Sequence, residues 1–518
     1  MSRVRADATR RWTMGWARSV LRAVLGRIKE WFRQARSLLR AALGRIKEWF
    51  RQAYHAHCIG SPRPGVSSAR AWVEGVVATA AVECMERAYR RAVERVLRHP
   101  AVPLCAPPTF RSRSILFAAG SLGPGGSERQ VVTTLAGLAR AGYTDLSLLC
   151  FSLSDRGSDF YRPLLDGTPV TCAELRAAGS PRPIDALRCP DAVADDARER
   201  MRAVLRPLPG ELRDVERIAL DLLERRPGIV HAWLDDVNVK AGLAAAIVGV
   251  PRIVLNVRSV APPNFLLFQP YMRPIYQALA SLPALSFLSN STAGARSYAA
   301  WLGIDERRFR VVRNGLDCAR LPHGAERDAV RAEYRASRGI PEHVLVVGTV
   351  MRFSEEKRPL LWLQTAAEVA RRVPEAVFLM VGDGPLREAV RERAEEAGLG
   401  RRLVLCGQED RPAHAMAAMD VFLLSSRLEG LPNVLIEAQA MGIPVVTTDV
   451  GGARETLCPG TTGHAVAAET AGALADAVVD VLRDPAFRER VRIAAPQFVR
   501  QAFDVQRLIH ETVAAYET

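Results

Sequence analysis

The sequence predicts an α/β protein with two Rossmann-like domains that face each other across a cleft, preceded by a basic, amphipathic helical extension. From about residue 113 onward, short apolar runs alternate with helical stretches, which is typical of parallel sheets covered by helices on both faces. The expected strands are 114–119, 146–150, 229–233, 253–257 and 285–288 in the first domain, and 344–348, 377–381, 403–406, 421–424 and 445–448 in the second. Ligands of such sheets bind beyond the carboxyl ends of the strands, which predicts a site between the two domains.

The chain divides into four predicted segments. They are a basic helical extension with a linker (1–65), a helix and proline-rich linker (66–112), a first domain (113–325) that the C-terminal helix (496–518) rejoins, and a second domain (326–495). Residues 151–228 are longer than an ordinary connection and are expected to form a mostly helical insertion in the first domain. Residues 258–273, rich in aromatic residues and proline, are either a loop that contacts a substrate at the cleft mouth or a plain surface loop.

The positive charge of the chain is concentrated at its amino terminus. The 518 residues carry 71 Lys and Arg against 56 Asp and Glu, a net charge of +15. Residues 1–53 alone hold 14 basic and 3 acidic side chains, a net of +11, which leaves +4 for the rest. This concentration in one amphipathic stretch argues against a nucleic-acid-binding protein. Nine cysteines without paired spacing predict neither a zinc site nor a disulfide framework, so a reducing cytoplasm is the expected compartment.

A tandem repeat explains the amphipathic stretch. Residues 36–53 repeat residues 18–35 with two changes, and eighteen residues complete five helical turns, so both copies continue one apolar stripe. Arginine interrupts every apolar run, so none is long enough to span a bilayer. Tryptophan and phenylalanine on one face with arginine on the other predict a helix lying on an anionic membrane surface through residues 18–53. A helix packed on the enzyme or on a partner protein is the alternative.

Two glutamates with seven residues between them, inside the segment 426–452, carry the strongest functional signal. Glu429 is followed by Gly430 and Leu431, and Pro432 is expected to be the first residue of a helix that contains Glu437. Gly442 ends this helix, and a buried strand follows. The free amides of the first helical turn suit an anionic ligand that also carries hydroxyl groups.

A second motif supplies positive charge after the strand expected at 344–348. Arg352 and Lys357 lie five residues apart, and an arginine fork with a mobile lysine suits phosphate oxygens. Lysine occurs only at positions 29, 47, 240 and 357, so the other 67 basic residues are arginine. A chain that prefers arginine this strongly has nevertheless placed lysine at 357.

Together these motifs resemble the signature of retaining glycosyltransferases of the GT-B fold, family 4. The resemblance implies that Glu429, with the backbone of Gly430, Leu431 and Pro432, holds the donor sugar. It implies that Glu437 holds the ribose, and that Arg352 and Lys357 hold the diphosphate. It implies no metal and no cofactor beyond the nucleotide-sugar co-substrate, for which we expect a UDP- or GDP-sugar.

The first domain contributes weaker candidates. The glycine-rich turn that ends at Gly126 enters a helix and lets backbone approach a donor, although tight packing explains it equally well. Many family members carry a histidine after the strand expected at 253–257, where this chain has Arg258. Arg258 is therefore a candidate contact for acceptor or phosphate, and so is His231, for which a buried structural role is the stronger alternative.

These features predict a glycosyltransferase at the inner face of the cytoplasmic membrane. It would move a sugar, with retention of configuration, to a glycan or polyprenol-linked acceptor in cell-surface polysaccharide or glycolipid synthesis. The alternative is a membrane-tethered scaffold of a polysaccharide-assembly complex that has kept the fold and lost turnover.

Overall fold

The computed structural model describes residues 85–97, 109–175, 210–265 and 268–517, together with the single positions 83, 205 and 208. The chain divides into two compact units, Met1–Met85 and Glu86–Thr518, and almost everything described belongs to the second. The expected amphipathic repeat at 18–53 and most of the following linker lie outside the described residues. Among the helices that are described, none is both long and apolar enough to cross a membrane.

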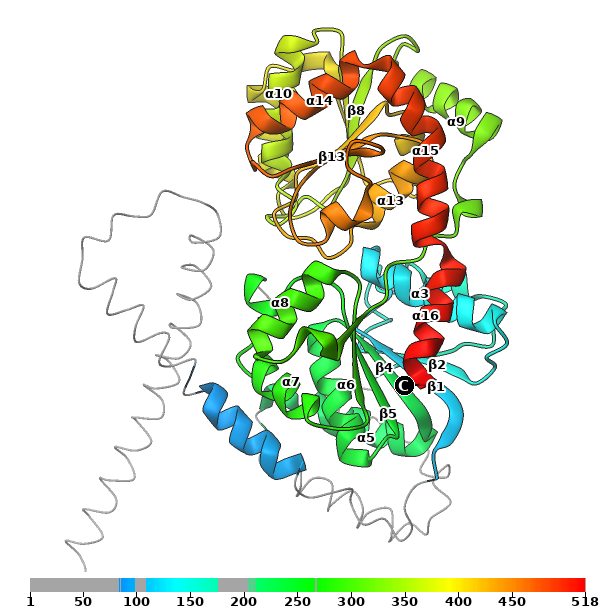
Figure 1. The fold of residues 1–518 in the computed structure, drawn as a ribbon, viewed down its shortest axis with the longest axis vertical. Helices are drawn as coiled ribbons and strands as arrows, with labels where there is room; N and C mark the ends of the chain where they lie inside the picture. The colour runs from blue at the N-terminus through cyan, green and yellow to red at the C-terminus, as the bar shows by residue number, and fades with distance from the viewer. Residues whose placement is uncertain are drawn as a thin grey trace, which may run out of the picture. The chain divides into compact units, whose positions relative to one another are not determined.

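The first domain is built on a parallel sheet, which in the described part of the chain has seven strands in the order β3-β2-β1-β4-β5-β6-β7 (Figure 1). The strands are β1 (Arg111–Ala119), β2 (Leu146–Cys150), β3 (Thr171–Glu174), β4 (Pro227–Trp233), β5 (Arg252–Val257), β6 (Leu285–Ser289) and β7 (Phe309–Val311). β1 lies between β2 and β4, where Ile115 pairs with Leu146 of β2 on one side and with Ile229 of β4 on the other. β2 and β4–β6 are mostly apolar, and β1 is apolar from Ile115 onward, as expected of strands that are buried on both faces.

The second domain repeats this plan with six strands in its described residues, in the order β10-β9-β8-β11-β12-β13. The strands are β8 (Val346–Val350), β9 (Val377–Val381), β10 (Leu403–Gly407), β11 (Val421–Leu424), β12 (Val445–Thr448) and β13 (Gly463–Val466). All pairings are parallel. The predicted fold class, two α/β domains with parallel sheets, is confirmed.

Each sheet reverses its strand order next to its first strand. The chain runs outward from β1 to β3 and returns to β4 on the other side of β1, and in the same way it returns from β10 to β11 beside β8. Crevices form at such switch points, where neighbouring loops leave in opposite directions. The loops that leave β8 and β11 carry the predicted donor-binding residues, so the topology itself brings these two loops together.

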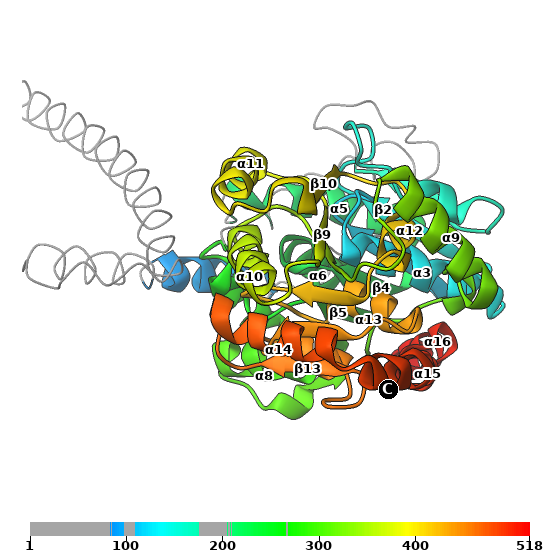
Figure 2. The ribbon, with the colours of Figure 1, turned by 90° about the horizontal axis from the view of Figure 1, so that it is seen from above.

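Helices cover both faces of each sheet. In the first domain they are α3 (Gly126–Arg140), α5 (Asp214–Arg225), α6 (Asp235–Val248), α7 (Met272–Ala280) and α8 (Thr292–Leu302). In the second they are α9 (Gly324–Ser337), α10 (Pro359–Arg372), α11 (Arg387–Glu396), α12 (Pro412–Ala417), α13 (Asn433–Ala440) and α14 (Ala471–Arg483). Figure 2 shows α10 and α14 side by side on one face of the second sheet, where Trp362 and Leu474 share a core.

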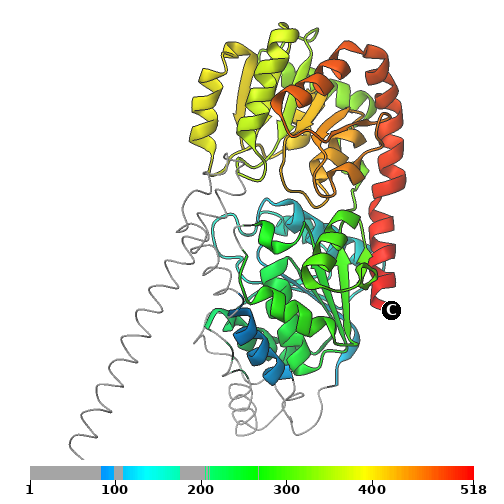
Figure 3. The same cartoon turned by 60° about the vertical axis from the view of Figure 1, so that its left-hand side comes forward.

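The helical residues 86–97 belong to the first domain. Val93 and Val96 are buried in the same core as α5, α6 and α7, and Figure 3 shows this blue helix beside the green helices of that domain. Arg90 donates to Gln277 of α7 at 2.7 Å, and the rings of Tyr89 and Tyr271 meet edge to face. The described end of the extension is therefore fastened to α7.

The C-terminal segment differs from its prediction. A single helix was expected from residue 496, but α15 (Pro485–Phe503) continues through Pro496, and a second helix, α16 (Val505–Glu517), follows after a break at Asp504. Asp504 forms a β-bridge with Leu316, whose N–H donates to the Phe503 carbonyl at 2.7 Å. Because the chain bends here, α15 packs on α13 of the second domain and α16 packs on α3 of the first (Figure 1).

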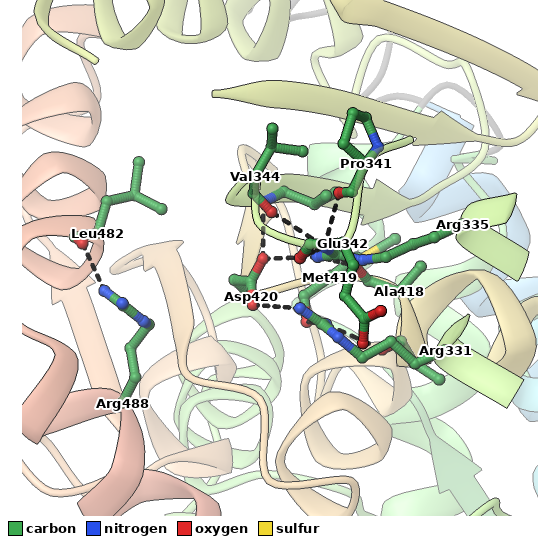
Figure 4. Close-up of polar contacts among 12 residues, drawn as sticks. Arg331, Arg335, Pro341, Glu342, Val344, Ala418, Met419, Asp420, Leu482 and Arg488 are labelled. Carbon is green, nitrogen blue, oxygen red and sulfur yellow. Dashed lines mark hydrogen bonds and ion pairs between the residues drawn. The ribbon is translucent and has the colours of Figure 1, made fainter. Parts of the chain in front are cut away.

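A saturated arginine network fastens α9 to the second sheet (Figure 4). Arg335 is buried, and its guanidinium donates to the carbonyls of Glu342, Val344 and Ala418 and to Asp420. Asp420 also accepts from Arg331 and from the N–H of Val346 at the start of β8. A buried charge is tolerated when it is paired and hydrogen-bonded in this way.

The strands that the sequence did not predict are short strands at the edges of the sheets. β3 has four residues and an edge position, β7 has three residues, and β13 begins with glycine. Each pairs with a single neighbouring strand at the edge of its sheet and is only partly buried, so none carries a continuous apolar run. The mostly helical insertion expected at 151–228 contains β3 as well as α5, and residues 176–204 of it lie outside the described part.

Candidate functional site

Hydrogen bonds from side chains to backbone carbonyls join the loop after β8 to the loop after β11. Arg358 donates to the carbonyls of Ser425 and Ser426 at 2.9 and 3.0 Å, and the Ser425 hydroxyl donates back to the carbonyls of Lys357 and Arg358. Arg358 adopts a left-handed conformation with φ of 49°, which turns the chain into α10. The two predicted motifs are thus held as one unit.

Lys357 and Glu429 meet at this junction. The Lys357 ammonium donates to Glu429 Oε1 at 2.6 Å, and the Glu429 side chain is 6% exposed. Arg352 stands exposed at the start of the same loop. Burial raises the pKa of Glu128 in the first domain, and the charge of Arg352 lies close enough to oppose that rise. Lys357, Glu429 and the loop that begins near Arg352 therefore lie together at the switch point of the second sheet.

The glycines of the second motif allow close backbone contact. A Cβ at Gly430 would lie 2.1 Å from the carbonyl oxygen of Arg258 in the first domain. Gly451, with φ of 52°, would place a Cβ 2.0 Å from the Glu429 carbonyl oxygen. Gly430 is therefore required where the two domains touch, and Gly451 is required where the loop after β12 supports Glu429.

The first turn of α13 meets the first domain through amide side chains. Pro432 is the N-cap of α13, so the helix begins at Asn433, one position later than the sequence predicted. The Leu431 carbonyl accepts from Asn314 at 2.8 Å, while its side chain packs against α15. Asn433 accepts from Asn314 at 2.6 Å and donates to the carbonyl of Gly126, the first residue of α3, at 3.0 Å. A side chain at Gly126 would press on Asn433.

Glu437, one turn further along α13, forms an ion pair with Arg129 of α3. Burial raises the pKa of Glu437, and the charge of Arg129 and its hydrogen bond oppose that rise. The carboxylate predicted to bind ribose thus already has a cationic partner from the other domain.

Arg258, at the carboxyl end of β5, is a buried cation without a carboxylate partner in the described residues. Its guanidinium lies 4.5 Å above the ring of Trp233 and donates to the amide oxygens of Asn314 and Asn256. Its Nε has no hydrogen-bond partner in the described structure. Burial lowers the pKa of Arg258 to about 9, and the nearby Glu128 carboxylate partly offsets this effect.

His231 takes the structural role that was weighed as its alternative. It is fully buried in β4, its Nδ1 lies 2.8 Å from the Tyr516 hydroxyl of α16, and its Nε2 lies 3.2 Å from the amide nitrogen of Asn256. Because an amide nitrogen can only donate, Nε2 accepts and Nδ1 carries the proton. Burial, reinforced by the charge of Arg258, lowers the pKa of His231 to about 3. Both ring nitrogens are engaged, so the geometry argues against His231 as a substrate contact.

Three side chains at this interface were not singled out from the sequence. Glu128 and Arg129 follow the glycine-rich turn directly, and Asn433 follows Pro432. Burial raises the pKa of Glu128, while its own backbone hydrogen bond and the charges of Arg352 and Arg258 lower it. In the sequence, Glu128 and Arg129 are only a pair of opposite charges in the first turn of a helix after glycines. Such a pair is as typical of a solvent-exposed helix start as of a binding site.

Two family models match the chain, and together they cover both domains. Glycosyltransferase Family 4 matches residues 124–320, and Glycosyl transferases group 1 matches residues 330–498. The first match begins in the glycine-rich turn before α3, and the second contains both predicted motifs.

Known proteins and solved structures agree with these matches. The chain is 30% identical to the Vi polysaccharide biosynthesis protein VipC/TviE of Salmonella typhi over 425 residues, which are 76% of this chain and 70% of that protein. It is 34% identical, over 32% of this chain and 47% of the relative, to a GDP-mannose-dependent phosphatidylinositol monomannoside mannosyltransferase of Mycolicibacterium smegmatis. The fold is similar to that of Anabaena HepE, solved with UDP and glucose, with a TM-score of 0.62 and 20% identity over 78% of this chain and 99% of that chain.

Proposed function

The chain belongs to the GT-B glycosyltransferases of family 4, and on that premise we propose that it transfers a sugar with retention of configuration from a nucleotide-sugar to a glycan or lipid-linked acceptor. Family membership makes it a glycosyltransferase, and its similarity to a Vi polysaccharide biosynthesis protein and to a phosphatidylinositol monomannoside mannosyltransferase supports a role in polysaccharide or glycolipid synthesis. The observation that carries the finer proposal is the Lys357–Glu429 contact of 2.6 Å at the switch point of the second sheet. A cation for the leaving group and an acceptor for sugar hydroxyls are adjacent there.

Arg352 and Lys357 would hold the donor diphosphate. Charge develops on the β-phosphate as the bond to the anomeric carbon breaks, and fixed cations stabilise that charge most in the transition state. Lys357 is positioned for this by Glu429 and by the hydrogen bonds of its own carbonyl to Ser425. Glu429 would then accept hydroxyl groups of the sugar ring, with the close backbone of Gly430 beside it.

The transfer exchanges one carbon–oxygen bond for another. The bond between the anomeric carbon and the β-phosphate oxygen breaks, and the acceptor hydroxyl oxygen bonds to the same face of that carbon. The hydroxyl proton passes to the leaving phosphate oxygen, so no side chain has to act as a base. A nucleoside diphosphate leaves, for which UDP and GDP are the probes that we would use first.

Purified full-length protein tests this function directly. We expect it to release UDP or GDP from a matching nucleotide-sugar, faster when a glycan or polyprenol-linked acceptor is added, and the product to keep the anomeric configuration in its proton NMR couplings. A protein that binds nucleotide but transfers no sugar across such a panel would instead be the non-catalytic scaffold of a polysaccharide-assembly complex. Inversion of the anomeric configuration would contradict the proposed mechanism.

The two glutamates should lose different functions when each is changed to glutamine. Glu437→Gln should weaken binding of the free nucleoside diphosphate, because its proposed partner is ribose. Glu429→Gln should leave that affinity nearly intact and impair sugar transfer. Calorimetric titration with UDP or GDP distinguishes the two variants, and equal losses of affinity would contradict these roles.

We further propose that residues 18–53 hold the enzyme on the inner face of the cytoplasmic membrane. Support comes from the +11 net charge of residues 1–53 and the repeated Trp and Phe in their sequence. A protein that begins at Val66 should stay active on a soluble acceptor but no longer sediment with vesicles rich in anionic lipid. Each basic residue near such a surface contributes about 1 kcal/mol, and salt should weaken the binding. Equal sedimentation of both proteins, or indifference to lipid charge, would assign the segment to a protein partner.

A further inference from the structure

Arg129 links the two domains at the carboxylate predicted to bind ribose. It lies in the first turn of α3, and its Nη2 donates to Oε1 of Glu437, which is 308 positions away in the sequence. The Glu437 side chain is 4% exposed and that of Arg129 is 27% exposed. Taking such a pair out of water is costly, so it calls for a reason beyond stability.

The contacts around this pair show that it is held in place. One helical turn before Glu437, Asn433 donates to the Gly126 carbonyl at 3.0 Å and accepts from Gln130 at 3.3 Å. Gln130 in turn bonds the backbone of Gly315, between the domains, with both atoms of its amide. The first turns of α3 and α13 therefore face each other, and Arg129 has a defined position between them.

The charges at this interface are not balanced. The side chains named for the site include four cations and three carboxylates, which leaves one positive charge in excess. They are Arg129, Arg258, Arg352 and Lys357 on one side and Glu128, Glu429 and Glu437 on the other. Without Arg129 the set would be neutral, and it would lose attraction for a diphosphate that carries two negative charges.

Two groups require the same carboxylate. Ribose hydroxyls need Glu437 as an acceptor, and Arg129 already donates to one of its oxygens. A guanidinium that is released from a buried carboxylate needs another anion, and its planar fork fits phosphate oxygens. In the donor the diphosphate is attached directly to the ribose. When the ribose binds Glu437, the diphosphate is therefore within reach of Arg129.

We propose that Arg129 is a donor-binding residue supplied by the first domain, which passes from Glu437 to the donor diphosphate when the ribose hydroxyls bind that carboxylate. This inference rests on the proposed function, because it requires a nucleotide at Glu437. Arg129 and Glu437 lie on different domains. The exchange therefore replaces a direct bond between the domains by one that runs through the donor.

Competition titrations with UDP and with uridine, on the full-length protein, test this exchange. In the wild-type protein the ratio of the two dissociation constants measures what the phosphates contribute. Arg129→Gln should weaken UDP by about tenfold or more, since it removes a charge-assisted phosphate contact. The affinity of this variant for uridine should be unchanged or higher, because Arg129 no longer competes with the ribose for Glu437. Arg129→Lys should restore part of the UDP affinity.

Two further variants make the outcome decisive. Glu437→Gln should lower the affinities for UDP and for uridine by the same factor, so the ratio of their dissociation constants should not change. Arg140→Gln, on the same helix with a half-exposed arginine 3.5 Å from Asp317, should change neither. If Arg129→Gln weakens UDP and uridine by the same factor, or changes neither, Arg129 only joins the domains and the proposal is wrong. A wild-type protein that binds neither UDP nor GDP would instead refute the proposed function itself.

Discussion

Arg335 and Arg258 are both buried arginines, with 1% and 6% of their surface exposed, yet their surroundings differ. All three guanidinium nitrogens of Arg335 donate to carbonyls or to Asp420 inside the second domain. Arg258 meets only amide oxygens and the ring of Trp233, and its Nε has no partner in the described structure. A cation whose charge the protein itself neutralises serves the fold. A cation left without a counter-charge between two domains is available to a ligand.

The largest expected effect concerns the saturated arginine. Arg335→Met leaves the carbonyls of Pro341, Glu342, Val344 and Ala418 without this donor and removes a buried partner of Asp420. This should lower the free energy of unfolding by about 3–5 kcal/mol. Denaturant unfolding followed by circular dichroism measures this loss. The control is Arg371→Met on the exposed face of α10, for which we expect less than about 0.5 kcal/mol. If both variants unfold alike, the contrast with Arg258 has no energetic basis.

A buried network of the first domain should respond to acid. The pKa of His231 is about 3 in the folded protein and 6.5 when exposed, so the unfolded chain binds its proton first as pH falls. The stability that neutral His231 contributes is therefore present above pH 6.5 and is lost toward pH 3, by about 3–4 kcal/mol between pH 6.5 and 4. His231→Gln should flatten the fall in stability over this range. His323→Gln, at an exposed site, should leave it unchanged, and an equally steep fall in both variants would contradict the assignment.

Lys357→Ala should show the reverse behaviour of Arg335→Met. The variant loses one charge-assisted contact to the leaving diphosphate, so kcat/KM should fall about a hundredfold while the unfolding midpoint changes little. Steady-state transfer assays together with thermal unfolding give both values. A folded variant with less than about a threefold loss would place Lys357 outside the site.

The smallest effect should come from Arg258. Arg258→Met keeps an apolar contact with Trp233, and no carboxylate loses an ion-pair partner. The free energy of unfolding should therefore stay within about 1 kcal/mol of the wild type. Turnover should fall about tenfold, because a buried cation that would face an anionic substrate is gone. Arg296→Met on α8, which breaks an exposed ion pair with Glu306, is the matched control. A large loss of stability with normal turnover would show that Arg258, like Arg335, serves only the fold.

Most of the fold could be predicted because buried parallel strands carry their own signal. Strands such as β2 and β11 are continuous apolar runs, and the glycines and prolines between them mark turns in any context. The C-terminal helix was misplaced for the opposite reason. Pro496 predicts a helix start, but α15 runs through it because α15 packs along α13, and the break falls at Asp504, where the chain pairs with Leu316.

The contact between Lys357 and Glu429 could also be anticipated from the sequence. Lys357 and Glu429 belong to loops that follow β8 and β11, and parallel neighbours at a switch point bring such loops together whatever the rest of the chain does. Arg129 was missed because a charged residue in a first helical turn is most often solvated. Its role depends on a partner from the other domain.

The sequence by itself determined the alternation of strands and helices, the two loops with their cations and carboxylates, and the glycines that permit close contact. These properties follow from each segment's own side chains, which decide burial and turn geometry over a few residues. The tertiary structure alone decided which charges are neutralised. Arg335 meets Asp420, Arg129 meets Glu437, and Arg258 meets no carboxylate among the described residues. That outcome depends on distances between segments far apart in the chain, and the energy of a charge depends on those distances and on burial.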